Sequence, residues 1–409
     1  MHIGIAGPIA TCDVLPLLDA ESTQLPIGSE GAPFMVTIIA QLLRRGHRVT
    51  AFTLSNDMPL RAGARMVARG PSFELHYTPI RPRAWPPNGM RPGRIVDLYE
   101  FERRGLRTAI RSVRPDVIHA HWSYEYAWSA LRAGVPHVVT CHDSPFVVAR
   151  FERDFRHGAY RWIRAGIAWH VLRHARRVTT VSPYMAGQVS SLCRVPVSVV
   201  GNPIAEYADR PASPARAGRA QVLMAGNGWS PWKNGAAGLQ AYALLQQRLD
   251  FAQLLLFGRG SEEGGPAWRA WRELGSPGDV VFNGAVAHDE LLAAMAAGDL
   301  LLHPSLEESF GAVLAEAMST GLPVVAGQAS GAAPWVVGDA GELVDVTCPR
   351  AMADAMQRLL LDSGTAATMG RRGRDRVRAC FSPDVVAALY EREYEAALAS
   401  SSDTRRVFA

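Results

Sequence analysis

The stretch that decides the fold reads HPSLEESFGAVLAEAMSTGLPVVA at 303–326. It starts where a short apolar run, Leu300–His303, ends and gives way to a polar loop. Apolar residues then recur at helical spacing, which predicts a helix over Gly311–Ser319. A Gly-Leu-Pro turn leads into a second apolar run, Pro323–Ala326. This order of strand, helix and strand is typical of a parallel α/β sheet.

The same alternation extends outward over the rest of the chain. Helices are predicted over Pro33–Arg45 and Ala236–Gln247, the first ending at a glycine suited to a helix C-terminus. The other predicted strands are Ile3–Ala6, Val49–Leu54, Asp116–His119, His137–Thr140, Arg177–Val181, Val197–Val200, Val222–Ala225, Gln253–Phe257 and Val280–Phe282. Apolar strands separated by helices imply parallel sheets covered on both faces. The predicted class is α/β, with two Rossmann-like doubly wound domains.

The domain boundaries are predicted from length and from one irregular segment. A chain of 409 residues is long enough for two domains. Residues 205–220 (AEYADRPASPARAGRA) show no periodicity and are predicted to be a linker. It separates a domain at 1–204 from a second domain at 221–384, and a final helix is predicted at 385–409. Ligands of such sheets bind outside the carboxyl ends of the strands, and two such domains also enclose a cleft.

Composition excludes several classes of protein. Hydrophobic content of 48% with 20% charged residues is that of a globular chain, not of a disordered one. The longest apolar stretch is interrupted by Asp299, so a membrane-spanning helix is not expected. The first residues have no basic leader and are predicted to form a strand, not a signal peptide. Five scattered cysteines favour reduced thiols and a cytoplasmic location over a zinc module.

One basic residue stands apart from the others. Of the 43 lysines and arginines, 42 are arginine, and Lys233 is the single lysine. A codon bias toward arginine accounts for the skew, and chance alone could leave one lysine. An ammonium differs from a guanidinium in reach and geometry, so a specific function for Lys233 is the other interpretation.

Two glutamates flank the predicted helix start. Glu308 lies just before it, and Glu316 lies eight residues further on. A carboxylate there can accept hydrogen bonds from sugar hydroxyls, while the free backbone amides of a helix N-terminus can bind a phosphate. As an isolated pair, the two glutamates could equally be a helix-start acid and a solvated surface residue.

The whole motif narrows that choice. P-S-x-x-E-x-F-G followed by E-A-M-x-x-G-x-P-V-V-A resembles the signature of the GT-B retaining glycosyltransferases of family 4. The resemblance implies two Rossmann-like domains facing across a cleft, and a C-terminal helix at 385–409 that returns to pack on the first domain. It assigns the donor sugar hydroxyls to Glu308 and the donor ribose to Glu316. It also assigns part of the phosphate binding to the amides of Ser309, Phe310 and Gly311.

The resemblance extends to other segments and shows one departure. Gly28 and the helix after it match the glycine loop of the family, although Ser29 stands where a second glycine is common. Lys233 falls where the family has a lysine that binds the donor diphosphate. Asn227 stands six residues earlier, where the family has an arginine, so one cation is missing. Arg259 is a candidate replacement on the next loop, and the other interpretation is an ordinary loop cation.

Further site residues follow from the same resemblance. His142 matches a strand-end histidine and is predicted to orient the donor sugar or the acceptor, so the predicted catalytic residues are His142, Lys233 and Glu308. The nucleotide base is expected near Val286. His119 and His121 could form a metal triad with His142, but no Asp, Glu or Cys at ligand spacing supports it. No metal and no cofactor are expected, since fixed cations and amides stabilise the leaving group.

The predicted function is transfer of a sugar from a nucleotide diphosphate sugar to a hydroxyl acceptor (glycan, lipid-linked saccharide or small metabolite), with retention and without metal. A nucleotide-sugar epimerase is the alternative enzyme. A Rossmann oxidoreductase is disfavoured because no G-x-G-x-x-G is complete, and a silent binding module is the third class.

Arginines cluster between Arg81 and Arg114 and between Arg150 and Arg177, the second group with Trp162 and Trp169. They are interpreted either as a solvated face or as a peripheral contact with an anionic membrane at the inner membrane face. Nucleic acid is not expected as a partner, because no nucleic-acid module is recognised.

Overall fold

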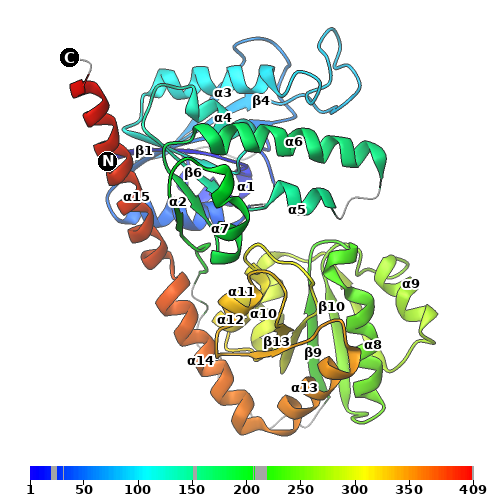
Figure 1. The fold of residues 1–409 in the computed structure, drawn as a ribbon. Coiled ribbons are helices and arrows are strands. Elements are labelled where there is room, and N and C mark those ends of the chain that lie inside the picture. The colour runs from blue at the N-terminus through cyan, green and yellow to red at the C-terminus, as the bar shows by residue number, and fades with distance from the viewer. Residues whose placement is uncertain (20–24, 31, 151–153, 206, 208–218, 408–409) are drawn as a thin grey trace. The chain divides into compact units, whose positions relative to one another are not determined.

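The computed structural model describes residues 1–19, 25–30, 32–150, 154–205, 207 and 219–407. The chain forms two compact units (Figure 1). Unit 1 comprises Met1–Pro203 and Pro383–Ala409, and unit 2 comprises Ile204–Ser382. Most of the linker predicted at 205–220 lies outside the described residues. Each unit contains a sheet flanked by helices, which confirms the predicted α/β class with two Rossmann-like domains.

Unit 1 is built on an eight-stranded sheet with the order β3-β4-β2-β1-β5-β6-β7-β8. The strands are β1 (His2–Ala6), β2 (Arg48–Ser55), β3 (Met66–Arg69), β4 (Phe73–Pro79), β5 (Val117–His121), β6 (His137–Cys141), β7 (Val178–Thr180) and β8 (Val197–Val199). The expectation of parallel pairing throughout is wrong at one edge, where β3 runs antiparallel to β4. Only three residues, 70–72, join these two strands, and such a short connection permits a hairpin but not a parallel crossover.

Helices cover both faces of this sheet. They are α1 (Thr11–Val14), α2 (Phe34–Arg44), α3 (Glu100–Val113), α4 (Glu125–Leu131), α5 (Pro145–Arg150), α6 (Phe155–His174), α7 (Pro183–Val189) and α15 (Pro383–Val407). In Figure 1, α3, α4 and α6 lie on one side of the strands, while α2 and α15 lie on the other. α2 buries Met35, Ile38 and Leu42, which recur at the spacing of one helical face.

The C-terminal helix α15 is an integral part of unit 1. Tyr390 and Tyr394 are buried against the sheet, and the Tyr394 hydroxyl lies 2.8 Å from Nδ1 of His119 on β5. Outside this core, Glu391 forms ion pairs with Arg45 at 2.7 Å and with His47 at 2.6 Å. Both apolar burial and ion pairs therefore hold the chain end on the first domain.

Unit 2 contains a six-stranded sheet with the order β11-β10-β9-β12-β13-β14, and every paired neighbour is parallel. The strands are β9 (Ala220–Ala225), β10 (Ala252–Phe257), β11 (Asp279–Gly284), β12 (Leu300–His303), β13 (Val324–Gly327) and β14 (Glu342–Val344). The helices are α8 (Gly235–Gln246), α9 (Pro266–Glu273), α10 (His288–Ala297), α11 (Ala312–Ser319), α12 (Ala333–Val337), α13 (Pro349–Leu361) and α14 (Ser363–Phe381).

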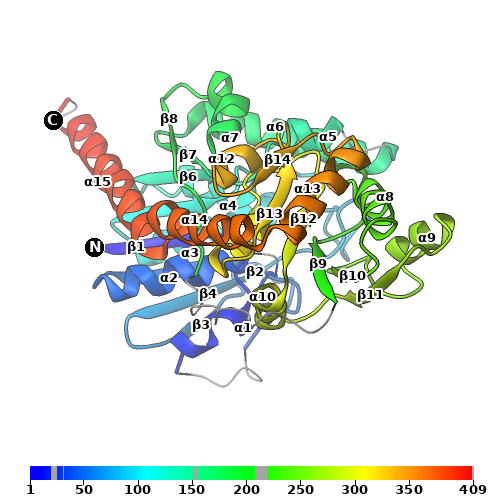
Figure 2. The ribbon, with the colours of Figure 1, turned by 90° about the horizontal axis from the view of Figure 1, so that it is seen from below.

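The helices of unit 2 form two layers. α8 contacts both α9 and α13 on one face of the sheet, and α11 contacts α10, α12 and α14 on the other (Figure 1 and Figure 2). The strands run in one direction, so the loops that follow β9, β10 and β12 meet at a single edge. The motif at 303–311 lies at this edge.

Candidate active site

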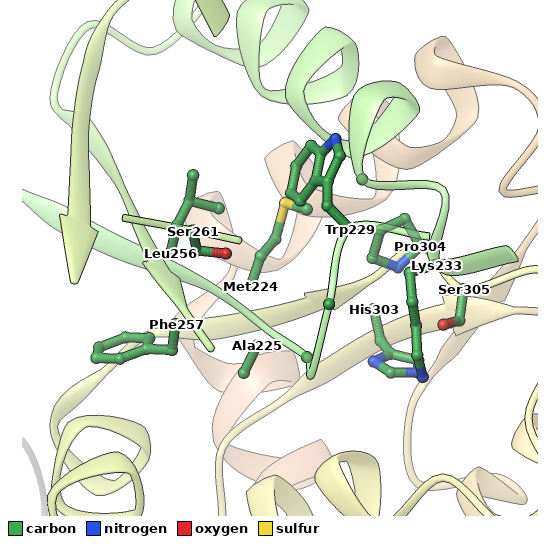
Figure 3. Close-up of a pocket in the computed structure, with 13 residues that line it drawn as sticks. Met224, Ala225, Trp229, Lys233, Leu256, Phe257, Ser261, His303, Pro304 and Ser305 are labelled. Carbon is green, nitrogen blue, oxygen red and sulfur yellow. The ribbon is translucent and has the colours of Figure 1, made fainter. Parts of the chain in front are cut away.

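A pocket opens at the carboxyl ends of β9, β10 and β12 (Figure 3). The backbone of Gly226 and Gly228, the Trp229 ring, and the side chains of Lys233 and His303 line it. In Figure 3, Lys233 and His303 lie side by side. All of these residues belong to unit 2, so a polar site is built within one domain.

The backbone of Lys233 is held in place by the turn that carries it. Pro231–Lys233 form one turn of 3-10 helix, after which Asn234 takes a left-handed conformation, with φ of 52°, and begins α8. The Asn234 side-chain amide donates to the carbonyl of Pro304 at 3.1 Å. The Leu306 amide donates to the carbonyl of Trp232 at 2.7 Å. These two bonds hold the lysine turn against the loop after β12.

Glu308 lies on that second loop and contacts two nitrogen donors. Its Oε1 lies 2.6 Å from Nζ of Lys233 and 3.0 Å from Nε2 of His303. Burial alone would raise the pKa of the Glu308 carboxyl. The hydrogen bond from His303 and the charge of Lys233 outweigh burial and hold this pKa well below its usual range. Glu308 is therefore an ionised carboxylate that faces two nitrogen donors.

His303 was not among the site residues predicted from the sequence. It is the last residue of β12, and its side chain is 4% exposed. Its Nδ1 is buried and has no hydrogen-bond partner in the part of the chain that the structure describes. Its place at a strand end, five residues before Glu308, was the available signal. Only the folded loop shows that the two side chains meet.

The loop then turns into α11 through a glycine. Gly311 has φ of 91°, a conformation that side-chain-bearing residues rarely adopt, and it lies directly before Ala312. Phe310 is buried, and its ring packs edge-on against Phe381 at 5.2 Å between centroids. The Phe310 side chain thus anchors the loop in the core, and only its backbone remains for ligand binding.

Glu316 lies on α11 and meets a different histidine. Its Oε1 is 3.0 Å from Nε2 of His288, the first residue of α10. The two predicted carboxylates each contact an imidazole, but His288 is far more exposed than His303. The two carboxylates themselves are exposed to a similar extent, 17% for Glu316 and 13% for Glu308, so the difference lies in their partners.

Asn227 and Arg259 lie on adjoining loops. The Gly226 amide donates to the carbonyl of Phe257 at 3.1 Å, and the Gly228 amide donates to the carbonyl of Arg259 at 3.0 Å. The side chains of Asn227 and Arg259 are both exposed. The structure therefore places a cation on the loop beside Asn227, where the resemblance left a charge missing.

This approach of the two loops depends on a glycine. A Cβ added to Gly258 would lie 2.0 Å from the carbonyl oxygen of Gly226, and the φ of Gly258 is 104°. A larger residue would push the loops apart. Val286 lies half-buried between β11 and α10, and it does not line the pocket described above.

Two predicted residues lie in unit 1. Gly28 has φ of 75°, and its amide donates to Oγ of Ser55 at 2.9 Å. His142 follows β6 and is buried, with Nε2 2.8 Å from Nδ1 of His121. Burial lowers the pKa of both imidazoles, that of His121 to about 3, so the pair is uncharged at neutral pH.

Several arginines are not surface cations. Arg81 is fully buried and pairs with Asp97 at 2.7 Å and with Glu102 at 2.6 Å. The interpretation of the first arginine cluster as a solvated or membrane-facing surface is therefore wrong for Arg81, because two carboxylates neutralise it inside the domain. In the second cluster, Arg164 lies 3.7 Å from the Tyr124 ring.

Two classes of feature are absent from the described residues. In the ranges given above, no three His, Cys, Asp or Glu side chains gather as metal ligands. No described helix is both long enough and apolar enough to cross a bilayer.

Comparison with family models gives two adjacent matches. Residues 32–206 match Glycosyltransferase Family 4, and residues 219–362 match Glycosyl transferases group 1. Among solved structures, sucrose-phosphate synthase from Thermosynechococcus elongatus superposes with a TM-score of 0.73. The two share 21% identity over 98% of this chain and 100% of that one. The fold is therefore that of the GT-B glycosyltransferases.

The two family matches together identify the family of this chain. This chain belongs to the family-4 glycosyltransferases, also described as glycosyl transferases group 1. A second structure, Anabaena HepE in complex with UDP and glucose, aligns over 96% of this chain and 99% of that one, with a TM-score of 0.65 and 18% identity.

Relatives of known activity match over a shorter range. A GDP-mannose-dependent alpha-(1-6)-phosphatidylinositol monomannoside mannosyltransferase from Mycobacterium tuberculosis is 36% identical over 157 residues, which are 35% of this chain and 39% of that protein. A trehalose synthase from Rubrobacter xylanophilus is 31% identical over 160 residues, 37% of this chain and 38% of that protein. The chain thus aligns with about two fifths of the length of each of these relatives.

Proposed function

We propose that this protein is a retaining, metal-independent glycosyltransferase, which moves a sugar from a nucleotide diphosphate sugar to a hydroxyl acceptor. The observation that carries the proposal is the contact of Lys233 with Glu308, 2.6 Å apart at the pocket. A cation for the diphosphate and a carboxylate for the sugar lie within one ligand's reach. Family membership and the GT-B fold support the same function.

Lys233 neutralises the diphosphate in this proposal. With no donor bound, its ammonium rests on Glu308. Donor binding draws Nζ to the phosphate oxygens, where it stabilises the charge that develops on the leaving group. The backbone amides of Ser309–Gly311, at the start of α11, supply further donors.

Arg259 supplies the second cation, in place of the arginine that Asn227 replaces. The backbone carbonyl of Arg259 accepts a hydrogen bond from the Gly228 amide. In this proposal its long side chain extends from there to the diphosphate. Asn227 contributes an amide hydrogen bond without charge.

The two glutamates orient the donor. Glu308 accepts hydrogen bonds from the sugar hydroxyls, and Glu316 accepts them from the ribose. Val286 lies near the base. Similar proteins support such a donor, since one relative is a GDP-mannose-dependent mannosyltransferase and one solved structure contains UDP and glucose.

Unit 1 contributes the acceptor side. Gly28 remains the residue predicted for close backbone approach to the diphosphate, and His142 remains the residue predicted to orient the sugar or the acceptor. The acceptor oxygen attacks the anomeric carbon on the face that the diphosphate leaves. Its proton passes to a departing phosphate oxygen, so neither an enzymic nucleophile nor a metal is needed.

The acceptor is a hydroxyl group of a glycan, a lipid-linked saccharide or a small metabolite. Trp162 and Trp169 are 54% and 47% exposed on α6, which has no acidic residue. Besides the inward-facing Arg164, the helix carries an exposed Arg156 and the half-buried Arg161 and Arg173. This combination supports a peripheral contact with anionic lipid.

The test is a donor panel with product analysis. UDP-glucose, GDP-mannose, ADP-glucose and dTDP-glucose are each incubated with the protein in EDTA, and the melting temperature and the products are recorded. The proposal predicts stabilisation by one donor and retention at the anomeric carbon. An epimerised nucleotide sugar without transfer would instead indicate an epimerase, and no binding would contradict the proposal.

A further inference from the structure

The starting observation is the orientation of the His303 imidazole. Its Nε2 lies 3.0 Å from Oε1 of Glu308, and an ionised carboxylate oxygen can only accept a hydrogen bond. Nε2 therefore carries the hydrogen. The other nitrogen, Nδ1, is buried without a partner in the described part of the chain, so Glu308 alone determines which nitrogen is protonated when His303 is neutral.

Glu308 has two partners on one oxygen, and only one of them can stay during catalysis. Lys233 and His303 both contact Oε1. In the proposed function the lysine moves to the diphosphate when the donor binds. A carboxylate that is 13% exposed would then lose its cation, which is unfavourable unless another donor holds it.

We propose that His303 is a positioning residue for the donor sugar: its Nε2–H holds the Glu308 carboxylate ionised and aimed at the sugar hydroxyls while Lys233 is engaged with the diphosphate. This inference rests on the proposed function of the same pocket. His303 contacts no reacting atom in this role and acts only through Glu308.

The position of His303 explains why it can do this. It is the last residue of a central strand, so the sheet fixes its backbone. The backbone of Lys233 is also held, but its long side chain is 25% exposed and can change its direction without moving the turn. The buried histidine is the stationary partner of Glu308, and the lysine is the partner that can move.

The charged groups around His303 determine how its replacement changes the pH dependence of sugar binding. The charged side chains that the structure places in this cluster are Glu308, on the following loop, and Lys233, on the adjoining turn. The hydrogen bond from His303 lowers the pKa of the Glu308 carboxyl, against the effect of burial. Removing that bond raises the carboxyl pKa, so the acidic limb of sugar binding moves to higher pH.

The experiment uses three substitutions of the full-length protein. In H303Q, the side-chain amide nitrogen reaches the place of Nε2, whereas in H303N it reaches only that of Nδ1, and H303L has no donor. The control is H157Q, since His157 pairs with Asp154 at 2.9 Å on an exposed part of unit 1. The probes are UDP-glucose, GDP-mannose and ADP-glucose, with UDP, GDP and ADP as their sugar-free counterparts, titrated from pH 5 to 8.

The expected result separates the sugar from the diphosphate. H303N and H303L weaken binding of the nucleotide sugar roughly tenfold and shift its acidic limb upward. H303Q stays near the parent, as does H157Q, and the nucleoside diphosphates bind all variants alike. Equal loss of diphosphate and sugar binding would show a merely structural role and overturn the inference.

Two further outcomes are distinguishable. If H303N and H303Q behave alike while the parent binds a nucleotide sugar, the Nε2 role is wrong and the proposed function stands. If the parent binds no nucleotide sugar, the proposed function itself fails. Melting temperatures of the variants identify any that do not fold. If H303L is one of them, the comparison of nucleotide-sugar binding by H303Q and H303N still tests the role of Nε2.

Discussion

Replacing Lys233 by methionine removes the ammonium and keeps most of the side-chain length. A unit charge at about 4 Å from a phosphate, at an effective dielectric of about 20, contributes about 4 kcal/mol. The ammonium gives up its contact with Glu308 at 2.6 Å to reach that position, so the net contribution is smaller. We expect K233M to lose about 3 kcal/mol of transition-state stabilisation, a roughly hundredfold fall in kcat/KM.

The assay measures initial rates of sugar release or transfer at saturating and at limiting donor. Since the lysine binds the leaving group, both kcat and kcat/KM should fall. K233R retains the charge but presents a planar guanidinium, and its rates should lie between those of the parent and K233M.

A matched control comes from another cation of the same unit. Arg248 pairs with Asp354 at 2.5 Å on the surface, away from the pocket residues. R248M removes one cation and one ion pair, and it should leave the rates unchanged. If K233M turned over saturating donor at the parent's rate, the diphosphate role would be refuted.

Three other substitutions test separate parts of the structure. R259Q should weaken donor binding, and adding N227R should restore it in a calorimetric titration; no effect of either would remove Arg259 from the site. The hydrogen bond from Arg45 lowers the pKa of Glu391 to about 2, below its value of about 4.5 in an unfolded chain. Its stabilisation is thus present above pH 4.5 and lost toward pH 2, so the Tm deficit of E391Q should shrink as pH falls; a constant deficit would contradict this. R81M leaves two carboxylates unpaired and should cost about 3 kcal/mol in urea unfolding, a value near zero being the contrary result.

Much of the fold was predictable because its signals are local. The apolar runs that became β9, β10 and β12 stand between glycine and proline turns, and the helix after Gly311 follows its own periodicity. The edge strand β3, its neighbour β4 and the short edge strand β14 were missed. β4 carries Glu74 and His76 within its apolar pattern, and its partner has only four residues.

The site was predictable only as far as the motif extends. Lys233 and Glu308 were placed by resemblance, and the structure brings them into contact. The role of His303 depends on how the loop folds back onto the strand end, which spacing does not encode. Arg81 shows the opposite case, in which a residue predicted to be solvated or membrane-facing is buried because Asp97 and Glu102, 16 and 21 residues away in sequence, enclose it.

The most direct test of the account is the anomeric configuration of the transferred or released sugar. Proton NMR would follow the reaction of the parent protein with the stabilising α-linked nucleotide sugar, in the presence of EDTA. The account predicts a product that is initially α, formed at an undiminished rate without divalent metal. An initially β product, or a reaction that stops in EDTA, would contradict it.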